Sequence, residues 1–193
     1  MGEEFGSPDS LAGKYYWVID PIDGTKNFLR GVPTWATLIA LMNDKGESIV
    51  GVVSAPALNR TWFAKVGSGA FVQFNGIERK ISVSKVSKIS DASISYSDLL
   101  GWGDRRSKFV ELQNKVWRTR SYGDFWSYVL VAEGAVDLAT EPTLNLWDMA
   151  ANEIIVREAG GTFTNLDGKA GPHGGNAVAS NGLIHQEFLK EIQ

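Results

Sequence analysis

The chain of 193 residues is 44% hydrophobic and 21% charged, which suits a single folded domain over residues 1–193. Its net charge of −3, from 19 basic and 22 acidic side chains, leaves no basic surplus to neutralise the phosphates of a nucleic acid. The chain has no cysteine and only two histidines, His173 and His185, which excludes disulfides, thiolate nucleophiles and metal sites rich in cysteine or histidine. Any metal ion must therefore be held mainly by oxygen, which suits magnesium, manganese or calcium.

The sequence contains no sign of a membrane segment. Its first four residues, MGEE, lack the basic and apolar pattern of a secretion signal. Its apolar runs are far shorter than the roughly 18 residues typical of a membrane-spanning helix. We therefore expect a cytoplasmic protein that binds neither membrane nor nucleic acid.

Strand patterns dominate the first half of the chain. Aromatic and β-branched residues predict a strand at 15–19, and Pro21 and Gly24 predict a turn at 20–25. Asn75 and Gly76 favour a two-residue hairpin turn. Because turn signals separate the segments that follow, we expect one antiparallel sheet with further strands at 37–41, 49–54, 61–65, 69–74 and 79–83.

Helices and strands alternate in the second half. The predicted strands lie at 92–97, 118–121, 135–139, 161–164 and 177–180. Asp124 is placed to cap the start of one helix. Strands followed by alternating helices and strands indicate a layered mixed α/β, or α+β, fold. The helices are expected at 105–116, 124–133 and 146–159, with a last one from Leu183.

Two aspartates mark the end of the first predicted strand. Asp20 and Asp23 are three residues apart around Pro21, so a turn there aims both carboxylates to one side. Gly24 allows a close backbone approach, and amides near Gly24 and Thr25 face an anion if a helix begins there. Carboxylates beside a phosphate-sized site require a cation between them. Two metal ions roughly 3.5–4 Å apart are able to activate water for phosphate ester hydrolysis.

Each of these features also has a simpler interpretation when it is taken alone. Asp-Pro-x-Asp-Gly is often an ordinary surface turn, and a calcium-binding structural turn would also use its carboxylates. Asp148, in the first turn of an apolar helix, is of a type that commonly complements the helix dipole. The combination is more specific, because Glu3 and Glu4 lie upstream and Asp148 lies downstream of a strand that ends in two aspartates.

Four segments together resemble the signatures of the inositol monophosphatase superfamily, in the order in which that family carries them. The resemblance extends over essentially the whole chain. It implies a layered α-β-α-β sandwich and magnesium-dependent hydrolysis of a small-molecule phosphate monoester, without a phosphoenzyme. The segments are residues 2–4 (GEE), 17–28 (WVIDPIDGTKNF), 146–151 (LWDMAA) and 158–161 (EAGG).

The resemblance also implies a role for each residue of the site. Asp23, Gly24 and Thr25 would contact the phosphate, and the Thr25 hydroxyl and Glu3 would act as catalytic groups that orient the attacking water. Glu4 would contact the metal ligands without binding the metal itself. The family is commonly dimeric, so a homodimer is expected. The implied ligands of two or three Mg²⁺ ions are the carboxylates of Glu3, Asp20, Asp23 and Asp148 and the main-chain carbonyl of Ile22.

The residues at the alcohol end of the implied site predict the substrate. Gly123, Asp124 and Glu141 stand where family members contact the alcohol, and inositol phosphatases typically carry a small or hydroxylic residue at position 124. Two carboxylates favour a cationic alcohol. Histidinol phosphate carries an ammonium group, whereas inositol phosphate carries only hydroxyls. Segments 23–33, 52–58 and 170–175 also resemble the bacterial histidinol-phosphatase branch.

We therefore expect conversion of histidinol phosphate to histidinol and phosphate, a step of histidine biosynthesis. The alternative substrate is inositol 1-phosphate or another sugar phosphate. The sequence departs from the family in one respect, because family members carry two helices before the Gly-Glu-Glu motif. These helices supply an aspartate that partners the threonine of the DGT motif. A shortened form of the fold is therefore expected, with exposed apolar surface. The alternative to an enzyme is an inactive or regulatory remnant that keeps this fold.

Overall fold

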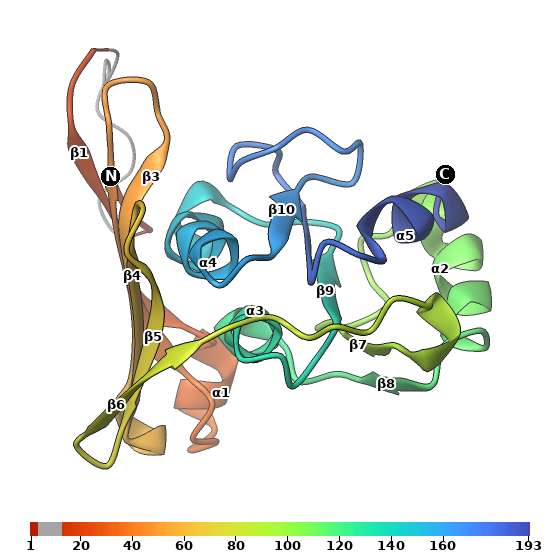
Figure 1. The fold of residues 1–193 in the computed structure, drawn as a ribbon, viewed down its shortest axis with the longest axis horizontal. Coiled ribbons are helices and arrows are strands. Elements are labelled where there is room, and N and C mark those ends of the chain that lie inside the picture. Colours follow the sequence, from red (N-terminus) through yellow and green to blue (C-terminus); the bar gives the residue numbers. More distant parts are fainter. Residues whose placement is uncertain (4–12) are drawn as a thin grey trace.

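A six-stranded antiparallel sheet forms one side of the molecule, as the sequence predicts (Figure 1). The structure, a computed structural model, describes residues 1–3 and 13–193. The strands follow one another in chain order across the sheet. Buried and partly exposed residues alternate along β2, which places every second side chain against the core. The strands are β1 (Tyr16–Asp23), β2 (Ala36–Met42), β3 (Ser48–Ala55), β4 (Arg60–Lys65), β5 (Gly69–Phe74) and β6 (Ile77–Ile81).

Helix α4 (Leu146–Glu158) packs across the inner face of this sheet, and α3 (Asp124–Ala132) lies beside α4, with Phe125 against Trp62 of β4. A second, mixed sheet lies on their other side, in the strand order β10-β11-β9-β7-β8. Figure 1 shows the remaining long helices beyond it, which completes four layers and confirms the predicted α-β-α-β sandwich. These elements are β7 (Ser93–Ser95), β8 (Arg118–Arg120), β9 (Leu138–Glu141), β10 (Thr162–Thr164), β11 (Ala177–Ser180), α2 (Arg106–Gln113) and α5 (His185–Glu191).

The layers enclose two separate cores. The larger one lies around α3 and α4 and includes the buried side chains of Trp62, Phe125 and Met149. In the smaller one, on the side of α2 and α5, the rings of Trp102 and Phe109 stack at 3.7 Å between centroids. No helix among residues 1–3 and 13–193 is both long and apolar enough to span a membrane.

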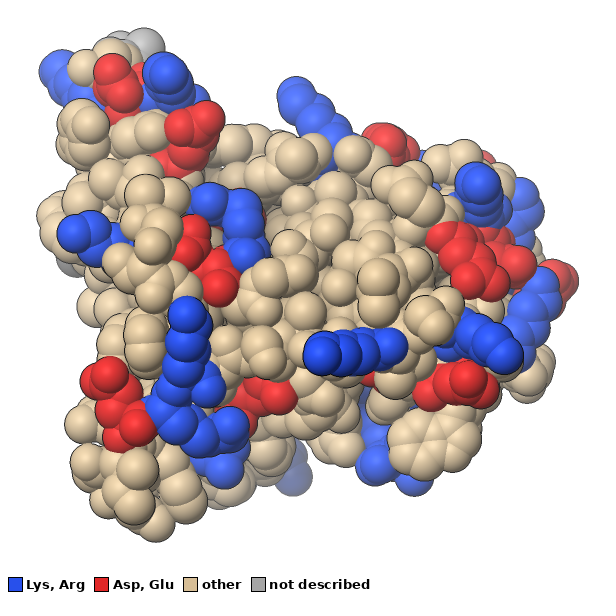
Figure 2. Space-filling view, viewed as in Figure 1, with Lys and Arg blue, Asp and Glu red and all other residues tan. Residues whose placement is uncertain are grey.

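The outer face of the six-stranded sheet carries exposed apolar side chains. Val18 is buried on the inner face, and its neighbours Trp17 and Ile19 point to the other side, where they are 52% and 39% exposed. Elsewhere, charges of both signs are interspersed on the face drawn in Figure 2.

Several element boundaries differ from the predicted ones because of hydrogen bonds that sequence patterns do not reveal. The segment 20–25, expected as a turn, continues β1 as far as Asp23, with a register irregularity after Asp20. The Thr37 hydroxyl, on β2, donates to the Pro21 carbonyl at 2.8 Å and holds this extension in the sheet. A short helix, α1 (Thr25–Leu29), follows at once.

Later boundaries shift for similar reasons. The Asn75-Gly76 hairpin is confirmed, but β6 begins directly after it and ends two residues earlier than predicted. The strand expected at 135–139 begins at Leu138, since the amides of Ala135 and Val136 both bond to the Leu130 carbonyl at the end of α3. The helices expected at 105–116 and from Leu183 are shorter, and correspond to α2 and α5.

Gly51 allows α4 to lie directly on the six-stranded sheet. A methyl group at this position would stand 2.5 Å from Ile154 Cγ2 and 2.8 Å from the Ala151 carbonyl oxygen, both on α4. This contact fixes the helix that carries Asp148.

We expect Gly51→Ala to lower the free energy of unfolding by about 1–3 kcal/mol, because the added methyl group overpacks this contact. Urea denaturation monitored by circular dichroism would measure the loss. Ser68→Ala, an exposed change in the next hairpin, serves as the control and should stay within about 0.5 kcal/mol. Equal stability of the Gly51 variant and the parent would show that the helix has room to move.

Candidate active site

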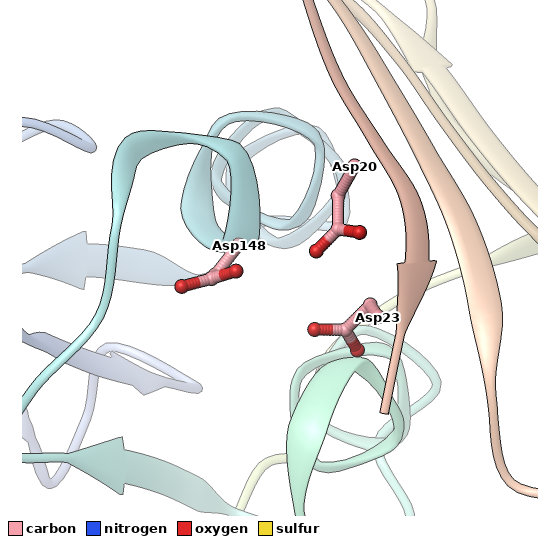
Figure 3. A group of neighbouring side chains, drawn as sticks. All are labelled: Asp20, Asp23 and Asp148. Carbon is pink, nitrogen blue, oxygen red and sulfur yellow. The ribbon is translucent and has the colours of Figure 1, made fainter. Parts of the chain in front are cut away.

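Three carboxylates meet where β1 ends and α4 begins. Asp20 and Asp23 project from β1, and Asp148 projects from the first turn of α4 toward them (Figure 3). One oxygen from each carboxylate lies within 4.8 Å of the other two. The structure thus brings together three of the acidic residues that the sequence singles out, although Asp148 lies 125 positions after Asp23 in the chain.

Each of these carboxylates is held by a backbone amide through one oxygen. The Ile22 amide donates to Asp20 Oδ1 at 3.0 Å. The Phe125 amide, at the start of α3, donates to Asp23 Oδ2 at 2.7 Å. The Asn145 amide, just before α4, donates to Asp148 Oδ2 at 2.7 Å. The second oxygen of each group is therefore available to a cation, in an orientation that the fold sets beforehand.

Burial and mutual repulsion make the three carboxylates reluctant to ionise. Burial, followed by the charges of Glu3 and Asp148, raises the pKa of Asp20 from 3.8 to about 7. Burial and the charge of Asp124 raise the pKa of Asp23 well above its ordinary value. Burial also raises the pKa of Asp148. A bound cation would remove this cost, so the donor set fits a hard divalent metal ion.

Glu3 is placed at the same pocket by a short pairing with β1. The Met1 carbonyl accepts a hydrogen bond from the Ile19 amide at 3.0 Å, and Gly2 bridges to Ile19. A methyl group on Gly2 would stand 2.5 Å from the Ile19 carbonyl oxygen, so this approach requires glycine. Glu3 lines the pocket but is not one of the three carboxylates whose oxygens cluster. Glu4 lies outside the described residues.

Gly24 and Thr25 connect the end of β1 to α1. Gly24 has a left-handed backbone, with φ of 79°, and a methyl group there would stand 2.9 Å from the Thr34 carbonyl oxygen. The Thr25 hydroxyl donates to the Ile22 carbonyl at 2.9 Å. That bond uses the hydroxyl proton and leaves the oxygen lone pairs free to accept a hydrogen bond.

Asp124 adopts an unusual backbone at the start of α3. Its φ of 49° is left-handed, a region that non-glycine residues seldom occupy. The prediction that Asp124 caps this helix is wrong, because Gly123 occupies the N-cap position and Asp124 is the first helical residue. The Asn27 side chain, on α1, donates to Asp124 Oδ2 at 3.1 Å and to the Thr34 carbonyl at 3.0 Å. Asn27 therefore links Asp124 to the backbone at Thr34, the residue whose carbonyl lies close to Gly24.

Glu141 ends β9 in the wall of the same pocket. Burial raises the pKa of its carboxyl from 4.5 to about 8. Its Oε1 atom is buried and has no hydrogen-bond partner among the described residues. Gly123, which the sequence also singles out, caps α3 and is not among the lining residues.

The pocket that these residues share has a volume of about 430 Å³. Among its described lining residues Lys26 is the single base, and it faces seven acids. Sequence reasoning missed Lys26, Asn27 and Tyr128. Lys26 and Asn27 directly follow Gly24 and Thr25, and this adjacency could have identified them as pocket residues. Tyr128 is brought to the pocket only by the fold. The acids are Glu3, Asp20, Asp23, Asp98, Asp124, Glu141 and Asp148.

Both histidines lie elsewhere. The His173 ring bonds to the Gly46 carbonyl at 2.7 Å in a surface loop, away from the lining of this pocket. His185 is buried, and its two ring nitrogens bond to the hydroxyls of Thr164 and Ser180. Neither histidine lines the pocket that holds the carboxylates.

Comparison with known proteins places this site in context. The model of the inositol monophosphatase family matches residues 1–193. A histidinol-phosphatase of Mycobacterium tuberculosis is 56% identical over 100% of this chain and 74% of its own length. One from Streptomyces coelicolor is 59% identical over 97% of this chain and 72% of its length. An IMPase structure from Thermotoga maritima superposes with a TM-score of 0.84 at 37% identity, covering 100% of this chain and 72% of that one.

The raised carboxyl pKa values predict how stability depends on pH when no metal is present. Asp20 titrates near pH 7 in the folded chain and near 3.8 when unfolded, so the folded form holds the extra proton between these values. The free energy of unfolding of the metal-free protein should therefore fall as pH rises from about 4 to 7. Chemical denaturation in the presence of a chelator, at several pH values, would measure the slope.

Asp20→Asn is the matched variant for this prediction. Without metal at pH 8 it should be more stable than the parent by about 1 kcal/mol or more, because the removed charge is repelled by its neighbours. Asp91→Asn, an exposed change far along the chain, should have no such effect. A metal-free parent that is as stable as the Asp20 variant at pH 8 would argue against the repulsion.

Proposed function

This chain belongs to the inositol monophosphatase family, and on that premise we propose that it hydrolyses histidinol phosphate to histidinol and phosphate. It is a phosphatase that acts on small-molecule phosphate esters. The choice of histidinol phosphate rests on one observation. Asp124 and Glu141 are two of the four carboxylates that line the pocket besides the clustered group of three, and the described lining offers only Lys26 against them.

We propose that Mg²⁺ is the metal and that the site takes two or three ions. The carboxylates of Asp20, Asp23 and Asp148 fit such ions, because one oxygen of each converges with the others and their charges need compensation. Glu3 and the main-chain carbonyl of Ile22 complete the proposed ligand set. When bound, the ions supply positive charge that polarises the phosphate and lowers the pKa of the attacking water.

The residues of the chain have separate tasks in the proposed reaction. The backbone amides of Gly24 and Thr25 bind the phosphate, beside Asp23. The Thr25 hydroxyl donates its proton to the Ile22 carbonyl, so its oxygen is left to accept a hydrogen bond from the water and orient it. Glu3, which directly follows the Gly2 bridge to β1, contacts the water as well. No side chain forms a covalent bond to phosphorus in this proposal.

The alcohol end of the pocket accounts for the substrate. Burial raises the pKa values of both Asp124 and Glu141, so each carboxyl ionises more readily when a positive charge arrives. Histidinol phosphate brings an ammonium group, which satisfies this requirement at one of the two carboxyls, and an imidazole ring with an N–H that can donate to the other. Inositol phosphate is the second candidate, since a relative from Thermotoga maritima carries the IMPase name and carboxylates also accept hydrogen bonds from hydroxyls.

A homodimer and a cytoplasmic location complete the proposal. The exposed Trp17 and Ile19 on the outer face of the six-stranded sheet, and the exposed Trp117 before β8, offer apolar surface for contacts with other protein.

The substrate proposal predicts an order of activity. With Mg²⁺, phosphate release from histidinol phosphate should be faster, in kcat/KM, than release from inositol 1-phosphate or glycerol 2-phosphate. Asp124→Asn keeps the side-chain shape and tolerates the left-handed backbone. It should lower kcat/KM for histidinol phosphate by about 30-fold or more, because a buried charge partner is lost. The other two esters should change much less. A parent enzyme that prefers inositol 1-phosphate would contradict the proposal.

The metal proposal predicts coupling between Mg²⁺ and protons. Added Mg²⁺ should raise the melting temperature and release protons at pH 7, since Asp20 and its neighbours must ionise to bind it. The stabilisation should grow between pH 6 and pH 8. Asp148→Asn should abolish both effects and the turnover, whereas Asp91→Asn should keep all three. Magnesium-independent turnover, or stabilisation without any hydrolysis, would contradict this role.

A further inference from the structure

Tyr128 is a buried residue of the pocket that the proposed reaction leaves without a task. It lies on α3 four residues after Asp124, so both side chains project from the same face of the helix. The residue is only 2% exposed, yet it lines the pocket. Its hydroxyl has no hydrogen-bond partner among the residues that the structure describes.

Packing alone does not explain this hydroxyl. The Tyr128 ring packs against Phe163 with centroids 5.8 Å apart, inside the larger core. A phenylalanine would make the same ring contacts without burying a polar group. Because a buried donor without an acceptor is costly, an unpaired hydroxyl in a pocket wall indicates a partner that arrives with a ligand.

Glu141 supplies the complementary group. Its Oε1 is also buried and unpaired among the described residues, and it lines the same pocket. Burial and the neighbouring carboxylates, Glu141 first among them, raise the pKa of Tyr128 well above its usual range. The hydroxyl therefore stays protonated, and its proton needs an acceptor. The wall thus offers one donor and one acceptor close to Asp124.

An imidazole ring matches that pair, and an ammonium group does not. A neutral imidazole carries one nitrogen that accepts and one N–H that donates, whereas an ammonium group only donates. Asp124, as an acceptor held by Asn27, suits the ammonium group.

We propose that the Tyr128 hydroxyl and Glu141 Oε1 form the subsite for the imidazole ring of the substrate, while Asp124 receives its ammonium group. Tyr128 donates to the unprotonated ring nitrogen, and Glu141 accepts from the ring N–H. Tyr128 is then a specificity-determining residue. This assignment rests on the proposed function, because it divides the alcohol part of histidinol phosphate between two sets of side chains.

The experiment compares two esters that share an ammonium group and differ in the ring. Histidinol phosphate has both, and O-phosphoethanolamine lacks the imidazole. Tyr128→Phe should lower kcat/KM for histidinol phosphate by about 5- to 30-fold, mostly through KM, since the contact is remote from phosphorus and is equally present before and during reaction. Its kcat/KM for O-phosphoethanolamine should stay within about twofold of the parent value. Asp124→Asn should lower both.

Two controls separate this role from a structural one. Tyr16→Phe removes a hydroxyl from β1 outside the pocket and should change neither ester. Binding of histidinol, which lacks phosphate and probes the alcohol subsite directly, should weaken in Tyr128→Phe by a similar factor when measured by calorimetry. A Tyr128 variant that loses activity on both esters equally has only a structural role for its hydroxyl, and overturns the inference.

The two proposals fail differently. If the parent enzyme prefers histidinol phosphate and Tyr128→Phe retains that preference and its histidinol affinity, the subsite assignment is overturned and the proposed function stands. If the parent enzyme prefers inositol 1-phosphate, the proposed function itself is overturned, and this result is seen before any variant is made.

Discussion

Repulsion among Asp20, Asp23 and Asp148 is the constraint around which the rest of this structure is arranged. Left to themselves, two buried carboxylates and a half-buried one would separate or enter water. Here a backbone amide binds one oxygen of each carboxylate, and the fold holds one oxygen from each within 4.8 Å of the other two. The fold thereby stores an unfavourable charge arrangement that a divalent cation relieves. Affinity for metal and instability without it are two results of the same geometry.

The architecture serves this arrangement by bringing three element ends to one place. β1 delivers Asp20 and Asp23 where its pairing with β2 becomes irregular. The Phe125 amide of α3 reaches Asp23 and so joins β1 to this helix, whereas the Asn145 amide holds Asp148 within the start of α4. Gly51 and the larger core fix α4 against the sheet. Packing in the interior therefore sets the position of charges at the surface of the pocket.

The sequence predicted the parts of this arrangement that depend on local pattern or on motif. The bounds of β5 and β11 are as expected, and so is the antiparallel pairing of the first sheet. The acidic cluster followed from a motif that resembles a known family. What could not be predicted depends on contacts between distant segments. Asn27 meets Asp124 across 97 residues, and the unpaired state of Tyr128 is visible only once its surroundings are known.

The left-handed backbone of Asp124 restricts which amino acids evolution can place at the alcohol end of the pocket. Side chains with a branched Cβ are strongly disfavoured there, whereas glycine, asparagine and aspartate adopt this conformation most readily. The substitutions of Asp124 that this backbone tolerates best therefore replace the charge with the neutral amide of asparagine or remove the side chain altogether, as in glycine. A library built to alter selectivity gains little from randomising position 124 fully. It gains more from combining these three residues with variation at Tyr128 and Glu141.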